Sequence, residues 1–444
     1  MGQLKVSNKK IWNLAYPIIL GGIAQNIVLA TDTAFLGRLG EVALGAAALG
    51  GLFYYIAFFV ANGIGVGAQI IMSRRFGEKN YTLIGAVMAQ TGILMAGFTL
   101  LLFVFMYLFS GAFFSMSINS EEVRNATHAF LTYRSWGIFF AGINVLMRAF
   151  FISIHRTRVI TYTTVLIGIV NVTLDYALIF GHFGLPQMGV EGAALASVIS
   201  EASASLFLIV YIQVMIPSKR YKLRFTLKPE LERLGRIMKI STPVMLQNFL
   251  SMAGWFIFFL FVEHLGEAQL AVSNIIRSIY MVLLIPVFGF ASAAATLVSY
   301  LMGSESTDQV FPLLRKVVVM VILSVAVILI PVILFQHSFL RFYTVSPELI
   351  ELAHGPLRVI FGTVFLYAVG FTLFHGVSGT GNTLVSLLIE GSVLILYLVT
   401  VWLFVFVFHF NVTLVWLAEF VYAVFLGLIS SVYLKMGHWQ DKLV

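Results

Sequence analysis

Long apolar segments alternate with short polar segments along the entire chain. Most apolar segments have about twenty residues or more, which lets an α-helix cross a bilayer hydrocarbon core of about 30 Å. Helices satisfy their own backbone hydrogen bonds, so they are the expected form of such segments in lipid. The pattern predicts an all-α polytopic membrane protein with twelve transmembrane helices. The predicted spans are residues 13–36, 46–72, 83–109, 128–152, 160–182, 190–216, 240–262, 270–302, 314–336, 356–376, 384–408 and 411–434.

The basic residues gather in alternate loops between these spans. With the N-terminus on the cytoplasmic side, most Lys and Arg residues fall in cytoplasmic loops, and only Arg38, Arg124 and Arg341 fall in loops on the opposite side. Cytoplasmic loops of membrane proteins carry an excess of Lys and Arg. We therefore predict a multi-pass protein of the plasma (inner) membrane with both termini in the cytoplasm.

Composition excludes several classes of protein. Hydrophobic residues make up 60% of the 444 residues and charged residues only 10%, against about 25% charged residues in soluble domains. The net charge of +8 is explained by the loops, so we expect no nucleic-acid partner. The chain has no cysteine and no phosphate-binding loop, zinc-protease motif or nucleophile elbow. We predict a protein that is not an enzyme and has no cofactor.

The sequence contains an internal repeat. When the chain is shifted by 226 residues (243 − 17), Pro17 meets Pro243, and Leu39–Glu41 meets Leu265–Glu267. One register therefore holds across several helices, which indicates a duplication. The further matches are Leu44 with Leu270, Gly63 with Gly289, Ser73 with Ser299, Gly77 with Gly303 and Thr157 with Thr383.

The longest polar insertion separates the two repeats. We predict an N-lobe at residues 1–216, a basic cytoplasmic linker at 217–239 and a C-lobe at 240–444, with six helices in each lobe. Within the linker, KPELERLGRIMKI is compatible with an amphipathic helix on the inner leaflet or with a simple tether. Six helices per lobe give both lobes the same orientation, and parallel repeats of this kind place the substrate site between the halves. The organisation is typical of a transporter.

Asp32 is the only carboxylate within the first apolar segment. An acidic side chain at the bilayer centre costs about 2.5–3.5 kcal/mol on insertion scales, so such residues usually face water, pair with another group or bind a cation. The position of Asp32 is therefore a hypothesis of function.

A second carboxylate is expected at similar depth. In the fifth span Asn171 and Asp175 are four residues apart and share a helix face. Depth counted from the cytoplasmic side places Asp175 in the same half of the membrane as Asp32. Two carboxylates in a poorly hydrated pocket favour binding of a proton, with Asn171 and a hydroxyl from Ser197 or Ser200 completing the shell.

Two alternatives remain at this site. The same oxygen atoms suit Na⁺ at Asp32, Asn171 and Asp175, so sequence does not separate H⁺ from Na⁺. A purely structural role, in which the carboxylates pair with Arg134 or Arg148, is the other.

Other polar residues in the spans are candidates for a substrate cavity between the lobes. Ordinary hydrogen bonding between helices is the alternative role for these side chains. Glu419, in the last span, is a further buried carboxylate. The cavity candidates are Tyr16, Gln25, Gln247, Asn248, Glu201 and Glu390.

These features together resemble the multidrug and toxic compound extrusion (MATE) family. The resemblance rests on Pro17 and Gln25 followed by DTAFLGRLG, on GIGVGAQIIMSRRFG, on NVTLD and on GVEGAALASVIS, and it covers essentially the whole chain. It implies alternating access of two six-helix lobes, with export of organic cations and amphiphilic drugs in exchange for H⁺ or Na⁺. The expected partners are these drugs and membrane lipids, and we expect a monomer.

The resemblance also assigns roles to residues. The chain is similar to prokaryotic members with an N-lobe coupling site, which implies coupling at Asp32, Asn171, Asp175 and Ser197. The chain lacks the acids in the seventh and tenth helices that other members use in the C-lobe. Two other functions stay open: a flippase for lipid-linked saccharides of the same superfamily, and a membrane scaffold that transports nothing.

Overall fold

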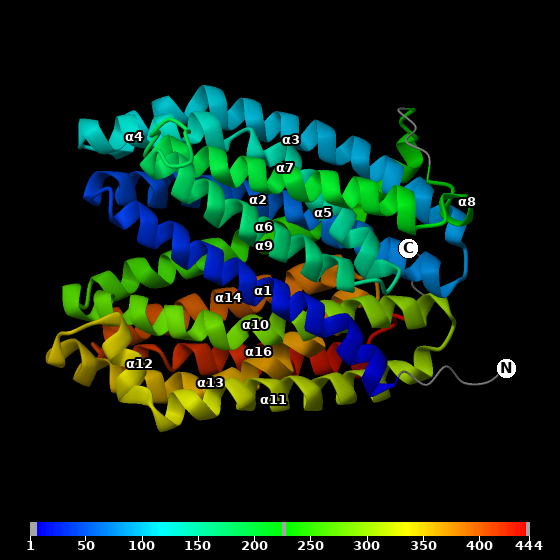
Figure 1. The fold of residues 1–444 in the computed structure, drawn as a ribbon. Coiled ribbons are helices and arrows are strands. Elements are labelled where there is room, and N and C mark those ends of the chain that lie inside the picture. The colour runs from blue at the N-terminus through cyan, green and yellow to red at the C-terminus, as the bar shows by residue number, and fades with distance from the viewer. Residues whose placement is uncertain (1–6, 224–227, 441–444) are drawn as a thin grey trace. The chain divides into compact units, whose positions relative to one another are not determined.

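The computed structural model describes residues 7–223 and 228–440, and every regular element in these ranges is a helix (Figure 1). Within these described residues, eleven helices are long and apolar enough to cross a membrane. A twelfth span is made by two shorter helices, α4 (Glu121–Arg134) and α5 (Gly137–Ser153), which meet at an angle of 49°. The prediction of an all-α polytopic fold is confirmed.

The first half of the chain contains the first six membrane spans. Each helix begins or ends close to a polar loop, and several extend beyond the predicted apolar segments because their polar end turns are also helical. Besides α4 and α5, the helices are α1 (Asn8–Gly37), α2 (Glu41–Gly77), α3 (Tyr81–Ser117), α6 (Arg158–Phe180), α7 (Val190–Met215) and the short α8 (Ser218–Tyr221).

The second half of the chain repeats this order of helices, but its spans are interrupted at different positions. The eleventh span ends in a π-helical turn, and the twelfth is interrupted after a single turn. Its helices are α9 (Leu231–Glu263), α10 (Glu267–Gly303), η1 (Thr307–Gln309), α11 (Val310–Leu334), α12 (Gln336–Tyr343), α13 (Pro347–Gly379), α14 (Thr383–Trp402), η2 (Leu403–Val407), α15 (Val412–Val415) and α16 (Ala418–Met436).

Helix α9 differs from the prediction at its start. The sequence KPELERLGRIMKI (228–240) is compatible with an amphipathic helix on the inner leaflet or with a simple tether, and from Leu231 onward it forms the first turns of α9. No glycine or proline stops a helix between this segment and Pro243, so the helix runs on into the span.

The chain divides into two compact units. One unit comprises Leu20–Met245, and the other comprises the chain up to Ile19 together with the chain from Leu246 onward. This division differs from the predicted lobes for the first turns of α1 and α9. Both helices carry a proline two residues before the division, Pro17 and Pro243, and a proline inside a helix removes one backbone hydrogen bond.

The duplication is visible in the geometry of each unit. Helices α2 and α10 both have 37 residues and begin 226 positions apart (267 − 41). Helix α2 packs on α3 and α5, as α10 packs on α11 and α13, and the pair α6 and α7 corresponds to α14 and α16. Equivalent glycines, Gly40 and Gly266, precede α2 and α10 with φ of 110° and 122°.

Replacing Gly40 by alanine is expected to destabilise the protein by about 1–3 kcal/mol, because its φ and ψ of 110° and 177° lie in a region that is essentially restricted to glycine. A Cβ at Gly40 meets no atom within 4 Å, so the effect comes from the backbone alone. Thermal unfolding of the purified protein in detergent measures it.

Gly97→Ala is the matched control for this substitution. Gly97 lies inside α3 and also has open space around its Cβ position, so alanine there is expected to stabilise the helix by roughly 0.5–1 kcal/mol. Equal melting temperatures for Gly40→Ala and the wild type would contradict the assigned backbone conformation.

Candidate functional site

The structure brings the two predicted carboxylates into contact. Asp32 lies in the second half of α1 and is half-buried, whereas Asp175 lies on α6 and is fully buried. Their side chains are hydrogen-bonded to each other. An ionised carboxylate only accepts hydrogen bonds, so a hydrogen bond between the two groups forms when one of them carries a proton.

Asn171 and Ser197 are hydrogen-bonded to each other on the same helix pair that carries Asp175. Asn171 is one turn before Asp175 on the buried face of α6, as the spacing predicts. Its Nδ2 donates to Ser197 Oγ on α7 at 3.5 Å, and Ser200 Oγ donates to the Ser197 carbonyl at 2.8 Å. The packing of α6 on α7 therefore carries these groups to the same place.

A separate ion pair lies in the same unit. Arg134, the last residue of α4, donates from Nη2 to Glu201 Oε1 at 2.6 Å and from Nη1 to Oε2 at 2.9 Å. The guanidinium lies 3.6 Å from the ring centre of Tyr54, and the Tyr54 hydroxyl donates to Glu201 at 3.3 Å. Gly137 packs against both charged groups, and a Cβ there would collide with Arg134. The guanidinium and the carboxylate are joined by two hydrogen bonds in bidentate geometry, which makes this a strong ion pair.

This ion pair changes two assignments made from sequence. Arg134 was considered as a structural partner for Asp32 or Asp175, and its salt bridge is with Glu201 instead, although it remains within electrostatic range of Asp32. Glu201 was a cavity candidate, and its carboxylate is held by the Arg134 pair. The two residues are 67 positions apart, so no local spacing reveals them. The one sequence signal that points to this pair is that a charged residue within a membrane span requires a partner.

The remaining cavity candidates are divided between the units. Gln25 is exposed on the part of α1 that belongs to the unit with Asp32. The others belong to the second unit: Tyr16 stacks on Trp12 with ring centres 6.3 Å apart, and Glu390 is buried on α14. Gln247 is buried and Asn248 half-buried, both on α9.

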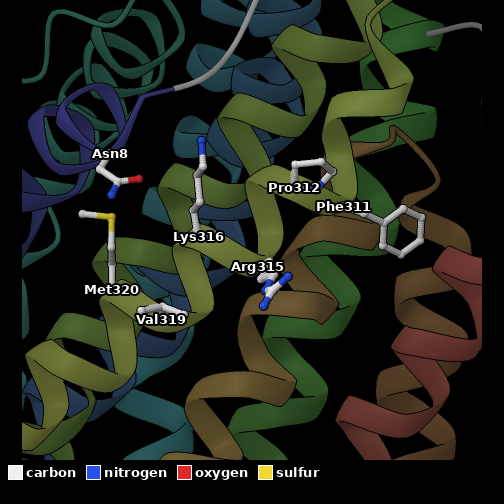
Figure 2. Close-up of a pocket in the computed structure, with 7 residues that line it drawn as sticks. All are labelled: Asn8, Phe311, Pro312, Arg315, Lys316, Val319 and Met320. Atoms are coloured by element: carbon white, nitrogen blue, oxygen red, sulfur yellow. The ribbon is translucent and has the colours of Figure 1, made fainter.

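A cavity of about 710 Å³ in the second unit lies away from all these residues. Figure 2 shows its lining side chains, which come from the start of α1 and from the first turns of α11. It contains none of the predicted site residues. The carboxylate cluster, and not this cavity, is therefore the candidate site. The lining residues are Asn8, Phe311, Pro312, Arg315, Lys316, Val319 and Met320.

Among the described residues, no group of three or more His, Asp or Glu side chains is arranged to hold a metal ion. A Na⁺ ion at the candidate site would therefore be held by two carboxylates with amide and hydroxyl oxygens from Asn171 and Ser197. This donor set fits a weakly bound monovalent cation better than a transition metal.

Comparison with known proteins decides the family. The family model MatE matches residues 17–177 and again residues 243–403. This chain belongs to the MatE family. The two matched segments are offset by 226 positions (243 − 17), the same shift that relates the internal repeats. The predicted MATE family is therefore confirmed.

Individual relatives agree with this membership. A protein of Thermotoga maritima called probable multidrug resistance protein NorM is 25% identical over 98% of this chain and 94% of its own length. A MOP superfamily transporter from Pyrococcus furiosus has the same fold, with a TM-score of 0.88 at 20% identity over 97% of this chain and 95% of that one. A MATE structure in complex with MaL6 gives a TM-score of 0.87, also at 20% identity, over 97% and 96% of the two chains.

Family membership settles several coarse predictions. Members are membrane transporters, so this MATE protein is a multi-pass membrane transporter and not an enzyme, as predicted. Membership also supports multidrug efflux over the flippase and scaffold alternatives.

We expect Glu201→Gln to destabilise this MATE protein by about 3–5 kcal/mol, because it leaves Arg134 buried without a carboxylate. The double variant Arg134→Gln/Glu201→Gln is expected to be more stable than Glu201→Gln alone, since both charges are then absent. Unfolding in detergent compares the variants.

The exposed pair Arg236–Glu232, with side chains 50% and 90% exposed, supplies the control. Glu232→Gln should change stability by less than about 1 kcal/mol. A Glu201→Gln variant no less stable than Glu232→Gln would show that the Arg134 pair contributes little.

Proposed function

We propose that this MATE transporter exports organic cations and amphiphilic drugs in exchange for protons, with Asp32 and Asp175 as the coupling carboxylates. The hydrogen bond between the two carboxyl groups is the observation that carries the proposal. It supplies a place where one proton is held between two acids.

The physical basis is the change in charge when that proton leaves. With the proton present, the pair carries at most one negative charge and is joined by a hydrogen bond. Without it, two negative charges face each other in a poorly hydrated site, and like charges at this distance repel strongly. Asp32 belongs to α1 and Asp175 to α6, so deprotonation pushes these helices apart at this point.

Helix α1 is suited to respond to this change. It contains Pro17, where one backbone hydrogen bond is missing and bending is easier. Gly21, one turn further on, lies close to the Thr164 hydroxyl of α6. In the proposed cycle, protonation from outside bends α1 between Pro17 and Gln25, the drug leaves, and the lobes return inward to release the proton.

Exchange requires that proton and drug favour different states. A ligand shifts a conformational equilibrium only through its different affinity for the two states. A cationic drug is attracted by the ionised pair and loses that attraction when the pair is protonated. Competition for the same negative charge is therefore sufficient to couple the two movements.

A proton is the first candidate because a hydrogen bond between two carboxyl groups contains one proton. Na⁺ could take the place of that proton between the same oxygens, because carboxylates also bind hard cations. Na⁺ coupling through the same oxygens is the second candidate, and transport measurements distinguish it.

Asp32→Asn is expected to reduce efflux driven by a pH gradient at least tenfold, because the amide side chain cannot release a proton. The assay uses purified protein in liposomes loaded with a fluorescent cationic dye, with pH and Na⁺ gradients imposed separately. The matched control is Asp308→Asn, which removes an exposed carboxylate in η1 and should leave efflux unchanged.

The outcomes separate the alternatives. Retained pH-driven efflux in Asp32→Asn would refute coupling at this site. Movement of dye under a Na⁺ gradient alone would keep the site and change the ion. No movement under either gradient in the wild type would contradict drug export itself.

A further inference from the structure

Glu390 is a buried carboxyl group that the proposed cycle does not use. It lies on α14, in the unit that comprises the chain up to Ile19 and the chain from Leu246 onward. Its side chain is buried, with an exposed fraction of 2%. Its Oε1 is 2.7 Å from Ser251 Oγ of α9 and 2.8 Å from the hydroxyl of Tyr422 on α16. Its Oε2 is buried without a hydrogen-bond partner, and no ion pair among the described residues includes it.

The hydrogen atoms around Glu390 can be counted. Ser251 has a single hydroxyl hydrogen, and its Oγ is also 3.0 Å from the carbonyl oxygen of Gln247, which can only accept. When Ser251 donates to Gln247, the short contact between Ser251 and Glu390 needs a hydrogen from Glu390. Two arrangements of the hydrogens fit these contacts: an ionised Glu390 accepts from both Ser251 and Tyr422, and a neutral Glu390 accepts from Tyr422 while its own hydrogen goes to Ser251 and Ser251 donates to Gln247.

The surroundings of Glu390 contain hydroxyl groups and aromatic rings. Tyr367 of α13 stacks on Tyr422 with ring centres 6.0 Å apart. Glu419 of α16, which is also buried in this unit, accepts from Tyr397 of α14 at 2.8 Å. Tyr280 of α10 lies against Tyr367 at 6.1 Å. These groups offer no positive charge to an ionised Glu390.

Two basic side chains of the same unit, on α10 and α13, have aromatic neighbours, and neither is among the hydrogen-bond partners of Glu390. The guanidinium of Arg277 on α10 lies 5.0 Å from the ring centre of Phe259. His375 on α13 packs edge-on against Phe371 at 4.4 Å. An isolated ionised carboxylate in such a place is costly, and the group takes up a proton instead.

We propose that Glu390 is a second proton-binding site, located in the unit that does not contain Asp32, and that Ser251 transmits its protonation to α9. When Glu390 releases its proton to water, the carboxylate requires a donor, so the Ser251 hydroxyl turns toward it. The hydroxyl then leaves the carbonyl of Gln247, one turn after Pro243. Protonation of Glu390 is thereby linked to the hydrogen bonds of the second proline-bearing helix.

This inference does not depend on coupling at Asp32, so it is tested without transport. Infrared difference spectra of the purified wild-type protein, recorded between acidic and alkaline buffer, show the carbonyl stretch of each protonated carboxyl group. Glu390→Gln is expected to remove one such band. Glu419→Gln and Asp32→Asn are expected to leave that band in place.

Ser251→Ala provides a second variant that does not touch the carboxyl group. Without the hydroxyl as acceptor, the Glu390 carbonyl band should move to higher frequency while keeping its area. This variant keeps the test informative if Glu390→Gln does not fold.

Two results would overturn the proposal. One is a Glu390→Gln spectrum with the same protonated-carboxyl bands as the wild type, and the other is an unchanged band in Ser251→Ala. Loss of dye efflux under a pH gradient with the Glu390 band intact would refute the proposed antiport and leave this site standing.

Discussion

The cost of an ionised group in an apolar interior governs the polar architecture of this protein. Buried carboxyl groups must be neutralised or hydrogen-bonded, and three arrangements in the structure illustrate this. Glu201 is paired with Arg134. Asp32 and Asp175 share a hydrogen bond that requires a proton. Glu390 is hydrogen-bonded by two hydroxyl groups, and none of the ion pairs found in the described part of the chain includes it.

These three solutions differ in whether they can be reversed. An arginine stays charged under all physiological conditions, so the pair of Arg134 with Glu201 is permanent and fixes α4 against α7, which pack on each other. A shared proton can leave and return, and its loss changes the charge of the site by one. Reversible neutralisation is what a coupled transporter requires, which is why Asp32 and Asp175 suit the coupling role and Glu201 does not.

Sequence predicted the features that depend on local pattern. Apolar length predicts the spans, and a four-residue spacing places Asn171 and Asp175 on one face. Asp32 can be identified because it is the only carboxylate in the first apolar segment, and a charge in such a segment is costly unless it has a function or a partner. The pairing of Arg134 with Glu201 and the break after α4 were not predictable, because they depend on which helices pack together across 67 residues and on the room that Gly137 leaves.

Duplication produced two similar backbones with different chemistry. At the repeat shift, Asp32 corresponds to Phe258, which is buried against Trp416 at 5.3 Å. Conversely, Glu390 and Ser251 correspond to Thr164 and Gln25 (390 − 226 and 251 − 226). Each unit thus carries ionisable chemistry at positions where the other unit has uncharged residues. The repeated backbone carries a proline inside both α1 and α9, while substitutions along it decide at which positions each unit has an ionisable side chain.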